Sequence, residues 1–137
     1  MSFEAIYTVR YPDDNLEAIP NPQPNNLHQI TTGKGYWIEA LEPASLTISG
    51  YQPFDYQTRL FAGWNYIGYP SLIARNISNA LASLGINYNK VYSYNAEQEK
   101  WEVYNLYQTP LEPNTITEIV PGKGYLIDLN SNAVWYP

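Results

Sequence analysis

Hydrophobic and polar residues alternate over several short stretches of this chain. Residues 64–69, WNYIGY, and residues 91–94, VYSY, place every second side chain on the same side of an extended backbone. The second stretch leads through the polar turn NAEQEK into another alternating run, which predicts a β-hairpin. Residues 6–11, IYTVRY, show the same alternation ahead of the polar sequence PDDN. The pattern therefore predicts short antiparallel strands.

One segment has a helical period instead. Its apolar residues follow the spacing i, i+3, i+4 and i+7, at Ile77, Ala80, Leu81 and Leu84. Asn76 is a good N-cap, and Gly85 provides a C-terminal stop. We expect an amphipathic helix of about two to three turns that covers one face of a small sheet. The expected fold class is mainly β, or α+β with one short amphipathic helix, built from small antiparallel sheets.

The sequence GKGY occurs twice, and the residues before it also correspond between the two copies. Asn26 and Gln29, like Thr115 and Glu118, have the spacing of a capping box, which predicts a short helical turn. The apolar residues of these turns should point inward, namely Leu27 and Ile30 in one copy and Ile116 and Ile119 in the other. After each GKGY we expect a strand, YWIEA or YLIDL, with SLTIS or AVWYP as its partner.

This internal repeat suggests how the chain is organised. Residues 63–137 form a complete repeat unit, residues 1–50 correspond to its C-terminal half, and residues 51–62 are a linker or strand. We expect residues 1–50 and 89–137 to superpose strand for strand. In that superposition the structural-turn glycines of the two copies coincide, Gly33 and Gly35 with Gly122 and Gly124.

Five short motifs follow one another in residues 63–137, namely GWNYIGYP, NALASL, VYSYN, ITEIVPGKGYLIDLN and AVWYP. Their order resembles a repeat of virion and tail-fibre structural proteins of phages, including cyanophages, and of large secreted surface proteins of bacteria. Residues 1–50 match only the second half of that repeat. The resemblance implies a non-catalytic structural or adhesive module, and it names no ligand.

The GKGY sequences do not fit a phosphate-binding loop. Such a loop needs G-x-x-x-x-G-K followed by Ser or Thr, and it leads into a helix. Here Gly33 and Gly122 are two residues from the next glycine, and Tyr36 and Tyr125 lead into an expected strand. A structural turn explains both copies.

Other candidate chemistry is sparse, and we expect no catalytic residues, metal site or cofactor. His28 is the only histidine, so a zinc site or catalytic triad would have no second imidazole. Glu39 and Asp128 occupy equivalent positions in the repeat and could form a carboxylate pair, but the alternation assigns Glu39 to a polar outer face. Asp13 and Asp14 lack the spacing of a calcium loop.

Aromatic residues are the one feature that fits two functions. The chain has 14 Tyr and 4 Trp. A row such as Tyr92, Tyr94 and Tyr104 on the predicted hairpin could form a platform for sugar rings. The same rings could instead fill the core or a subunit interface, where Tyr and Trp are also enriched.

Charge and composition argue against some classes of binding partner for this chain, namely nucleic acid and membranes. The net charge is −6 with only 7 Lys plus Arg, so nucleic acid and anionic membranes are poor partners. There is no cysteine, and no apolar run approaches the roughly 20 residues that span a bilayer. The first residues have no export signal. We therefore expect a soluble protein without membrane insertion.

These observations predict a non-catalytic structural protein or an assembly or adhesion module, most plausibly a phage virion component that belongs to the tail or the fibre or is associated with the capsid. The absence of an export signal favours the virion over a secreted surface protein. Because residues 1–50 lack the strand and helix that should cover them, we expect a homo-oligomer or a docked subunit of a larger assembly. The alternative is a carbohydrate-binding module of an extracellular or cell-surface protein, with a glycan as its partner.

Overall fold

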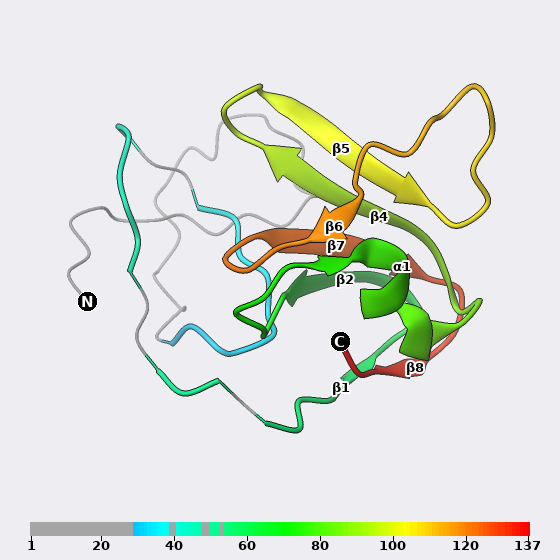
Figure 1. The fold of residues 1–137 in the computed structure, drawn as a ribbon, viewed down its shortest axis with the longest axis horizontal. Coiled ribbons are helices and arrows are strands. Elements are labelled where there is room, and N and C mark those ends of the chain that lie inside the picture. Colours follow the sequence, from blue (N-terminus) through cyan, green and yellow to red (C-terminus); the bar gives the residue numbers. More distant parts are fainter. Residues whose placement is uncertain (1–28, 39–40, 48–49, 53) are drawn as a thin grey trace, which may run out of the picture.

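The computed structural model describes residues 29–38, 41–47, 50–52 and 54–137. The elements in chain order are β1 (Thr58–Leu60), β2 (Gly63–Gly68), β3 (Arg75–Asn76), α1 (Ile77–Ala80), a 3₁₀ turn (Ala82–Leu84), β4 (Tyr88–Asn95), β5 (Lys100–Asn105), β6 (Glu118–Ile119), β7 (Gly124–Leu129) and β8 (Ala133–Trp135). Within these residues the strands form a four-stranded sheet, β2-β7-β4-β5, and the two-stranded pairs β1–β8 and β3–β6 (Figure 1). All pairings are antiparallel, so the predicted mainly β class with one short helix is confirmed.

The central sheet follows from the alternation in its sequence. β2 pairs with β7 from end to end, and β7 pairs with β4. β4 and β5 form the predicted hairpin, in which Asn95 lies opposite Lys100 at the turn. In β7 every second side chain, at Tyr125, Ile127 and Leu129, is buried against the core. The residues between them belong to the other face of the sheet.

The predicted helix is present, but it changes type near its middle. The Asn76 side chain accepts a hydrogen bond from the Ser78 N–H at 3.0 Å and so caps α1, as expected. A single α-helical turn then gives way to the 3₁₀ turn, which ends at Gly85 with φ 57°. All four apolar residues of the predicted stripe, Ile77, Ala80, Leu81 and Leu84, are buried, at 2% exposure or less. The helix therefore covers the sheet as expected (Figure 1).

The helical turn predicted before the second GKGY does not form. Thr115 caps no helix; its hydroxyl accepts a hydrogen bond from the Val103 N–H at 2.8 Å and thereby ties this segment to β5. Glu118 and Ile119 form β6, which pairs with β3. The β-branched residues of TITEI suit this pairing better than a helix, because branching at Cβ restricts side-chain rotamers in a helix. Ile116 and Ile119 nevertheless point inward, as predicted.

The last strand also has a different partner from the predicted one. AVWYP was expected to pair with YLIDL, but β8 pairs with β1, with Trp135 opposite Thr58 and Ala133 opposite Leu60. Both edges of β7 are already occupied, by β2 and β4. Trp135 is fully buried, and its indole Nε1–H donates a hydrogen bond of 2.8 Å to the Ala80 carbonyl. The pair β1–β8 therefore closes the core beside the helix.

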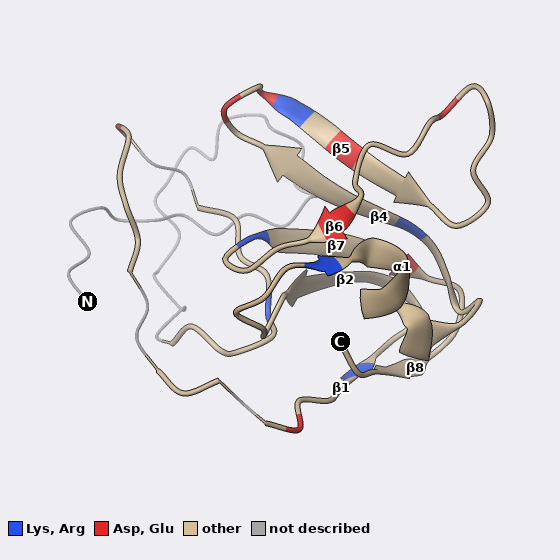
Figure 2. Cartoon of the chain, in the orientation of Figure 1, with Lys and Arg blue, Asp and Glu red and all other residues tan. Residues whose placement is uncertain are grey.

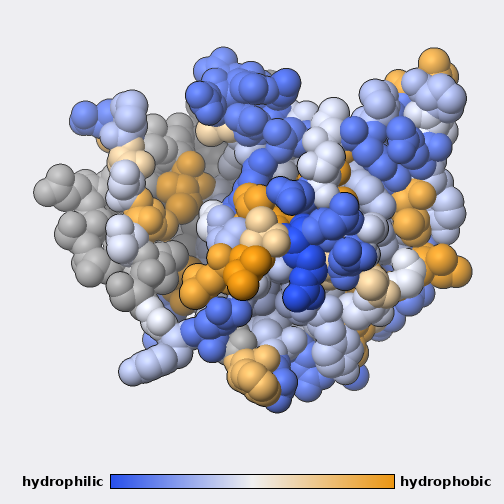
Figure 3. All heavy atoms as spheres, in the orientation of Figure 1, coloured by the Kyte–Doolittle hydropathy of each residue, from blue (hydrophilic) through white to orange (hydrophobic). Residues whose placement is uncertain are grey.

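Charged residues are few, and neither sign gathers into a continuous stripe along the described ribbon (Figure 2). On the side that carries α1, apolar side chains lie in small groups separated by hydrophilic ones (Figure 3). No helix in the described part of the chain has the length and apolar character needed to cross a membrane.

Candidate functional site

One face of the four-stranded sheet carries aromatic side chains. Strand alternation places Trp64 of β2, together with Tyr92 and Tyr94 of β4, on the face opposite the core. The hairpin register then puts Trp101 of β5 directly opposite Tyr94. Trp37 packs on the same group from outside the sheet. We call these five rings, Trp37, Trp64, Tyr92, Tyr94 and Trp101, the aromatic face.

The rings of the aromatic face contact one another in a continuous row. Tyr92 lies between Trp64 and Trp101, with ring centroids 5.8 Å and 6.3 Å away. Trp101 is 5.4 Å from both Tyr94 and Trp37, which are also 5.4 Å from each other. Their ring planes meet at 50° to 90°, the tilted and edge-to-face arrangements that aromatic pairs favour. Such a row presents ring edges and faces in several directions.

Residues 33–38 bring the fifth ring to the sheet. Lys34 forms an isolated β-bridge with Ile67, and the Gly68 N–H donates a hydrogen bond of 3.0 Å to the Gly33 carbonyl. The two backbones approach so closely that a Cβ at Gly68 would lie 2.6 Å from the Lys34 carbonyl oxygen. Glycine at this position is therefore what allows residues 33–38 to lie against β2.

The two GKGY sequences form the same turn. Gly33 and Gly122 have φ values of 78° and 77°, a conformation that glycine adopts without strain. In each copy a tyrosine hydroxyl accepts a 2.9 Å hydrogen bond from the backbone N–H five residues earlier, from Thr31 to Tyr36 and from Val120 to Tyr125. The tyrosine hydroxyl thus binds a backbone N–H on the other side of the turn. In a phosphate-binding loop, by contrast, the backbone N–H groups of the loop point at the phosphate.

Beyond the turns the two copies differ. The second copy continues into β7, whereas residues 35–38 and 41–47 form no strand. Ile30 is 42% exposed, although its counterpart Ile119 is buried. The prediction that the copies match strand for strand, with Ile30 inward, is therefore wrong for the described residues. The physical reason is that β7 has a strand on each side, whereas the first copy meets the sheet through one isolated bridge.

A hollow of about 270 Å³ lies beside the aromatic face. Tyr36, Trp37 and Ile38 line one part of it, and the rings of β4 and β5 line another. The turn at residues 122–124 also lines it. This hollow is close to the lower end of the size range of small-molecule sites.

Two lysines near the aromatic face form ion pairs. Lys123 hydrogen-bonds to Glu102, which holds the pKa of the Glu102 carboxyl below its ordinary value. Lys90 donates a 2.8 Å hydrogen bond to Glu112, which lowers the pKa of Glu112 and raises that of Lys90. Both carboxylates therefore stay ionised at neutral pH, each with an ammonium group beside it.

A row of polar side chains flanks the rings. Asp128 lies opposite Trp64 on one side and Lys90 on the other, and Lys90 lies opposite Asn105. We call Asp128, Lys90 and Asn105 the polar row. The Asn89 amide donates a 2.9 Å hydrogen bond to Asp128 and so fixes one oxygen of that carboxylate. The sheet therefore presents aromatic rings and hydrogen-bonding groups side by side.

Two of the rings are well exposed. Trp64 is 52% and Trp101 is 48% accessible to solvent. A large aromatic side chain that is half exposed has one surface packed and the other open to a partner. These two tryptophans are therefore the residues on which a binding function of this face would depend.

Tyr104 does not belong to this surface. It lies opposite Val91, which is fully buried, and it packs against the core together with Tyr88. Burial, with a smaller effect of Tyr104, raises the pKa of Tyr88 above its ordinary range. The predicted row of three tyrosines is thus divided between the two faces of the sheet. The hairpin register causes the division, because Tyr104 lies across from an odd-numbered residue of β4.

Sequence reasoning found Tyr92 and Tyr94 but did not single out Trp37, Trp64 or Trp101 as site residues. The alternation of residues 64–69 puts Trp64 on the same side as Tyr66 and opposite Ile67, but it does not say which side is exposed. Trp101 required the hairpin register. The position of Trp37 depends on a contact between distant segments that no local pattern encodes.

Several residues that the sequence raised as candidates lie outside the described residues: His28, Glu39, Asp13 and Asp14. Asp128, the proposed counterpart of Glu39, belongs to the polar row. In the part of the chain that the structure describes, no three His, Asp or Glu side chains gather closely enough to hold a metal ion.

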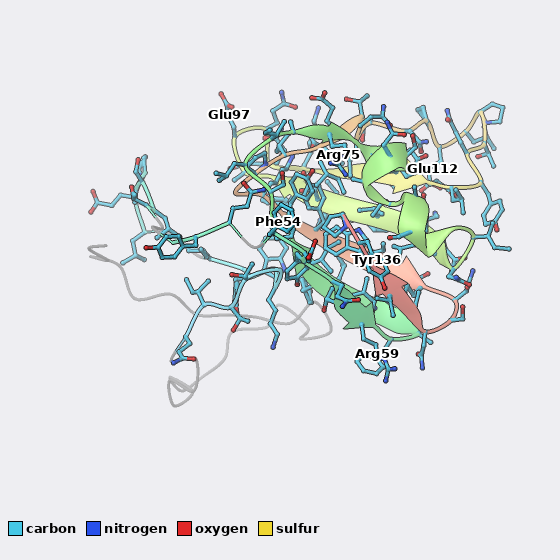
Figure 4. The ribbon with its side chains drawn as sticks, turned by 60° about the horizontal axis from the view of Figure 1, so that its bottom comes forward. Phe54, Arg59, Arg75, Glu97, Glu112 and Tyr136 are labelled. Carbon is cyan, nitrogen blue, oxygen red and sulfur yellow. The ribbon has the colours of Figure 1, made fainter. Side chains whose placement is uncertain are left out.

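A second hollow, of about 640 Å³, lies near the C-terminal residues and contains Phe54, Arg75 and Tyr136 (Figure 4). Phe54 is 98% exposed, and Arg75 is exposed as well. The second hollow is lined mainly by loop residues and by one guanidinium group. Among the described residues that line it, the aromatic side chains make no ring-to-ring contact. It is less organised than the aromatic face.

Comparison of the chain with protein-family models, with curated proteins and with solved structures found no match.

Proposed function

We propose that this protein is a non-catalytic adhesion or assembly module that makes contact through its aromatic face. The single observation behind this proposal is the pair of half-exposed tryptophans, Trp64 and Trp101, on a rigid four-stranded sheet. Tyr and Trp are the residues that most often anchor binding surfaces, because they offer large contact areas with few rotatable bonds. The resemblance of residues 63–137 to virion repeats favours a virion component.

The electrostatics beside the aromatic face favour contact over catalysis. A general acid needs a carboxyl whose pKa is raised toward neutral pH. Glu102 and Glu112 have lowered pKa values, because each accepts a hydrogen bond from a lysine. These carboxylates fix lysine side chains in place at the edge of the surface.

An adsorption assay tests the proposal. We expect the full chain to sediment with at least one member of a panel of bacterial and yeast cell envelopes. Replacing Trp64 and Trp101 together by alanine should reduce the bound fraction at least tenfold, because the two open ring surfaces are removed. Tyr107→Ala is the matched control, since Tyr107 is 58% exposed and lies outside the aromatic face.

Adsorption that is equal in the wild type and the double tryptophan variant would contradict the role of the aromatic face. Absence of adsorption to every envelope would contradict the adhesive function itself. Circular dichroism of each variant shows whether it is folded. Because both tryptophans are half exposed, we expect the variants to keep the wild-type spectrum.

A separate observation favours assembly with other subunits. Tyr51 and Phe54 are almost completely exposed, at 102% and 98%, and they lie close together in sequence outside the aromatic face. Tyr and Phe are enriched in the buried centres of contacts between protein chains. This surface suits the homo-oligomer or docked subunit that the half-repeat suggests.

Sedimentation at micromolar concentration tests this second surface. We expect the wild type to have a mass above the 15.7 kDa of one chain. The variant with Tyr51→Ser and Phe54→Ser should shift to the monomer mass, because it removes the apolar contact area. A wild type that stays monomeric would leave adhesion as the only function supported.

A further inference from the structure

We propose that the aromatic face binds a neutral, linear oligosaccharide. This inference rests on the proposed adhesive function and names its ligand. Trp64, Tyr92 and Trp101 follow one another at ring distances of 5.8 Å and 6.3 Å, so a chain of linked sugar rings can lie along them. The negative face of an aromatic ring attracts the C–H groups on the apolar side of a pyranose.

The tilt of the rings matters for this contact. Two rings stacked face to face would cover the surfaces that a sugar needs. Here Tyr92 and Trp101 meet at 90°, and Trp64 and Tyr92 meet at 51°. Neighbouring rings therefore support one another through edges and tilted contacts, and the half-exposed sides of the tryptophans stay open to a ligand.

The polar row supplies the hydrogen bonds that sugars require. A pyranose offers hydroxyl groups around its edge, each able to donate and to accept. Asp128 lies in register with Trp64, and Lys90 lies beside Asp128 on the same face. Asn89 and Glu112 hold these two side chains by hydrogen bonds of 2.9 Å and 2.8 Å. Stacking rings beside fixed polar groups match a ligand with an apolar face and a hydroxylated edge.

The net charge favours a neutral ligand over a polyanionic one. The chain has a net charge of −6, and two lysines near the aromatic face, Lys90 and Lys123, are paired with glutamates. A sulfated or phosphorylated polymer would meet the Asp128 carboxylate, which lies in register with Trp64 on this face. An uncharged saccharide meets no such penalty.

The size of the face argues against a flat protein partner. Strands of about six residues are about 20 Å long, and four strands at a spacing of about 4.8 Å cover a similar width. The face therefore has a projected area of about 400 Å², which is small for a protein interface. Residues 33–38 reduce that area further. A narrow, extended ligand fits this surface better than a second copy of the chain.

The envelope assay separates this inference from the function on which it rests. Envelopes are treated either with periodate, which cleaves the vicinal diols of sugars, or with protease. We expect adsorption of the full chain to be lost after periodate and retained after protease. Loss after protease alone overturns the saccharide ligand but keeps the adhesive function. Adsorption to no envelope overturns both.

Calorimetry with defined probes tests the site itself. The probes are the hexasaccharides of cellulose, starch, xylan and mannan, with heparin as the anionic comparison. We expect at least one neutral hexasaccharide to bind more tightly than heparin. Trp101→Ala should weaken binding at least tenfold, Trp101→Phe should weaken it less, and Tyr107→Ala should leave it unchanged. Preference for heparin, or equal affinity in Trp101→Ala, overturns the proposal.

Mapping by NMR keeps the test independent of any variant. With the wild-type protein and a bound hexasaccharide, we expect the largest shifts at the indole N–H groups of Trp64 and Trp101. Shifts confined to the second hollow, around Arg75 and Tyr136, would place the ligand elsewhere and contradict the assignment.

Discussion

Replacing Leu81 by aspartate should lower the free energy of unfolding by about 3–5 kcal/mol. Leu81 is 1% exposed, at the junction of α1 and the 3₁₀ turn, in the middle of the apolar stripe that covers the sheet. A carboxylate at this position would be buried among apolar groups, and its desolvation would oppose folding. Denaturant titration followed by circular dichroism measures the loss.

The neighbouring residue provides the control for this prediction. Ala82 is exposed, so Ala82→Asp introduces the same charge one position along the chain without burying it. We expect Ala82→Asp to stay within about 1 kcal/mol of the wild type. Equal stability of Leu81→Asp and Ala82→Asp would mean that the helix does not cover the core.

Truncating Trp135 to alanine should cost about 3–5 kcal/mol of stability. The Trp135 ring is fully buried where β8, the helix and β1 meet, and its N–H satisfies the Ala80 carbonyl at 2.8 Å. Alanine would leave a cavity and an unpaired carbonyl. Thermal and denaturant unfolding of the purified variant test this loss.

Two variants divide the effect of Trp135. Trp135→Phe keeps most of the ring but cannot donate the hydrogen bond, so we expect a smaller loss of about 1–3 kcal/mol. Tyr136→Ala removes a half-exposed ring next to it and keeps the backbone hydrogen bonds with Ser83, so its effect should be small. A Trp135→Ala protein as stable as Tyr136→Ala would show that β8 does not close the core.

Much of this fold could be predicted from local pattern. The alternation around Trp64 and in VYSYN correctly predicts β2 and the β4–β5 hairpin, because a half-buried strand imposes a period of two on its sequence. The i, i+3, i+4, i+7 spacing and the Asn76 cap correctly predict the covering helix. These signals are local, so they can be seen without knowing which segments meet.

The errors concern partners that are distant in sequence. β8 pairs with β1, which precedes the repeat unit of residues 63–137, and TITEI forms a strand because β3 is available to it. The aromatic face also depends on contacts between segments that are distant in sequence. Tyr92 and Tyr94 were predicted from alternation, whereas the exclusion of Tyr104 and the arrival of Trp37 depend on register and on the contact of residues 33–38 with β2. No local periodicity contains that information.

The pairing of β1 with β8 has a mechanical consequence. Thr58, the first residue of β1, lies opposite Trp135, the last residue of β8. A pulling force transmitted by the chain before Thr58 and after Trp135 therefore acts on the same end of this antiparallel pair. Its hydrogen bonds would be loaded one after another, as in a zipper, and the four-stranded sheet would bear load only afterwards. Under tension the molecule should first release β8, lengthening the chain while the aromatic face keeps its shape.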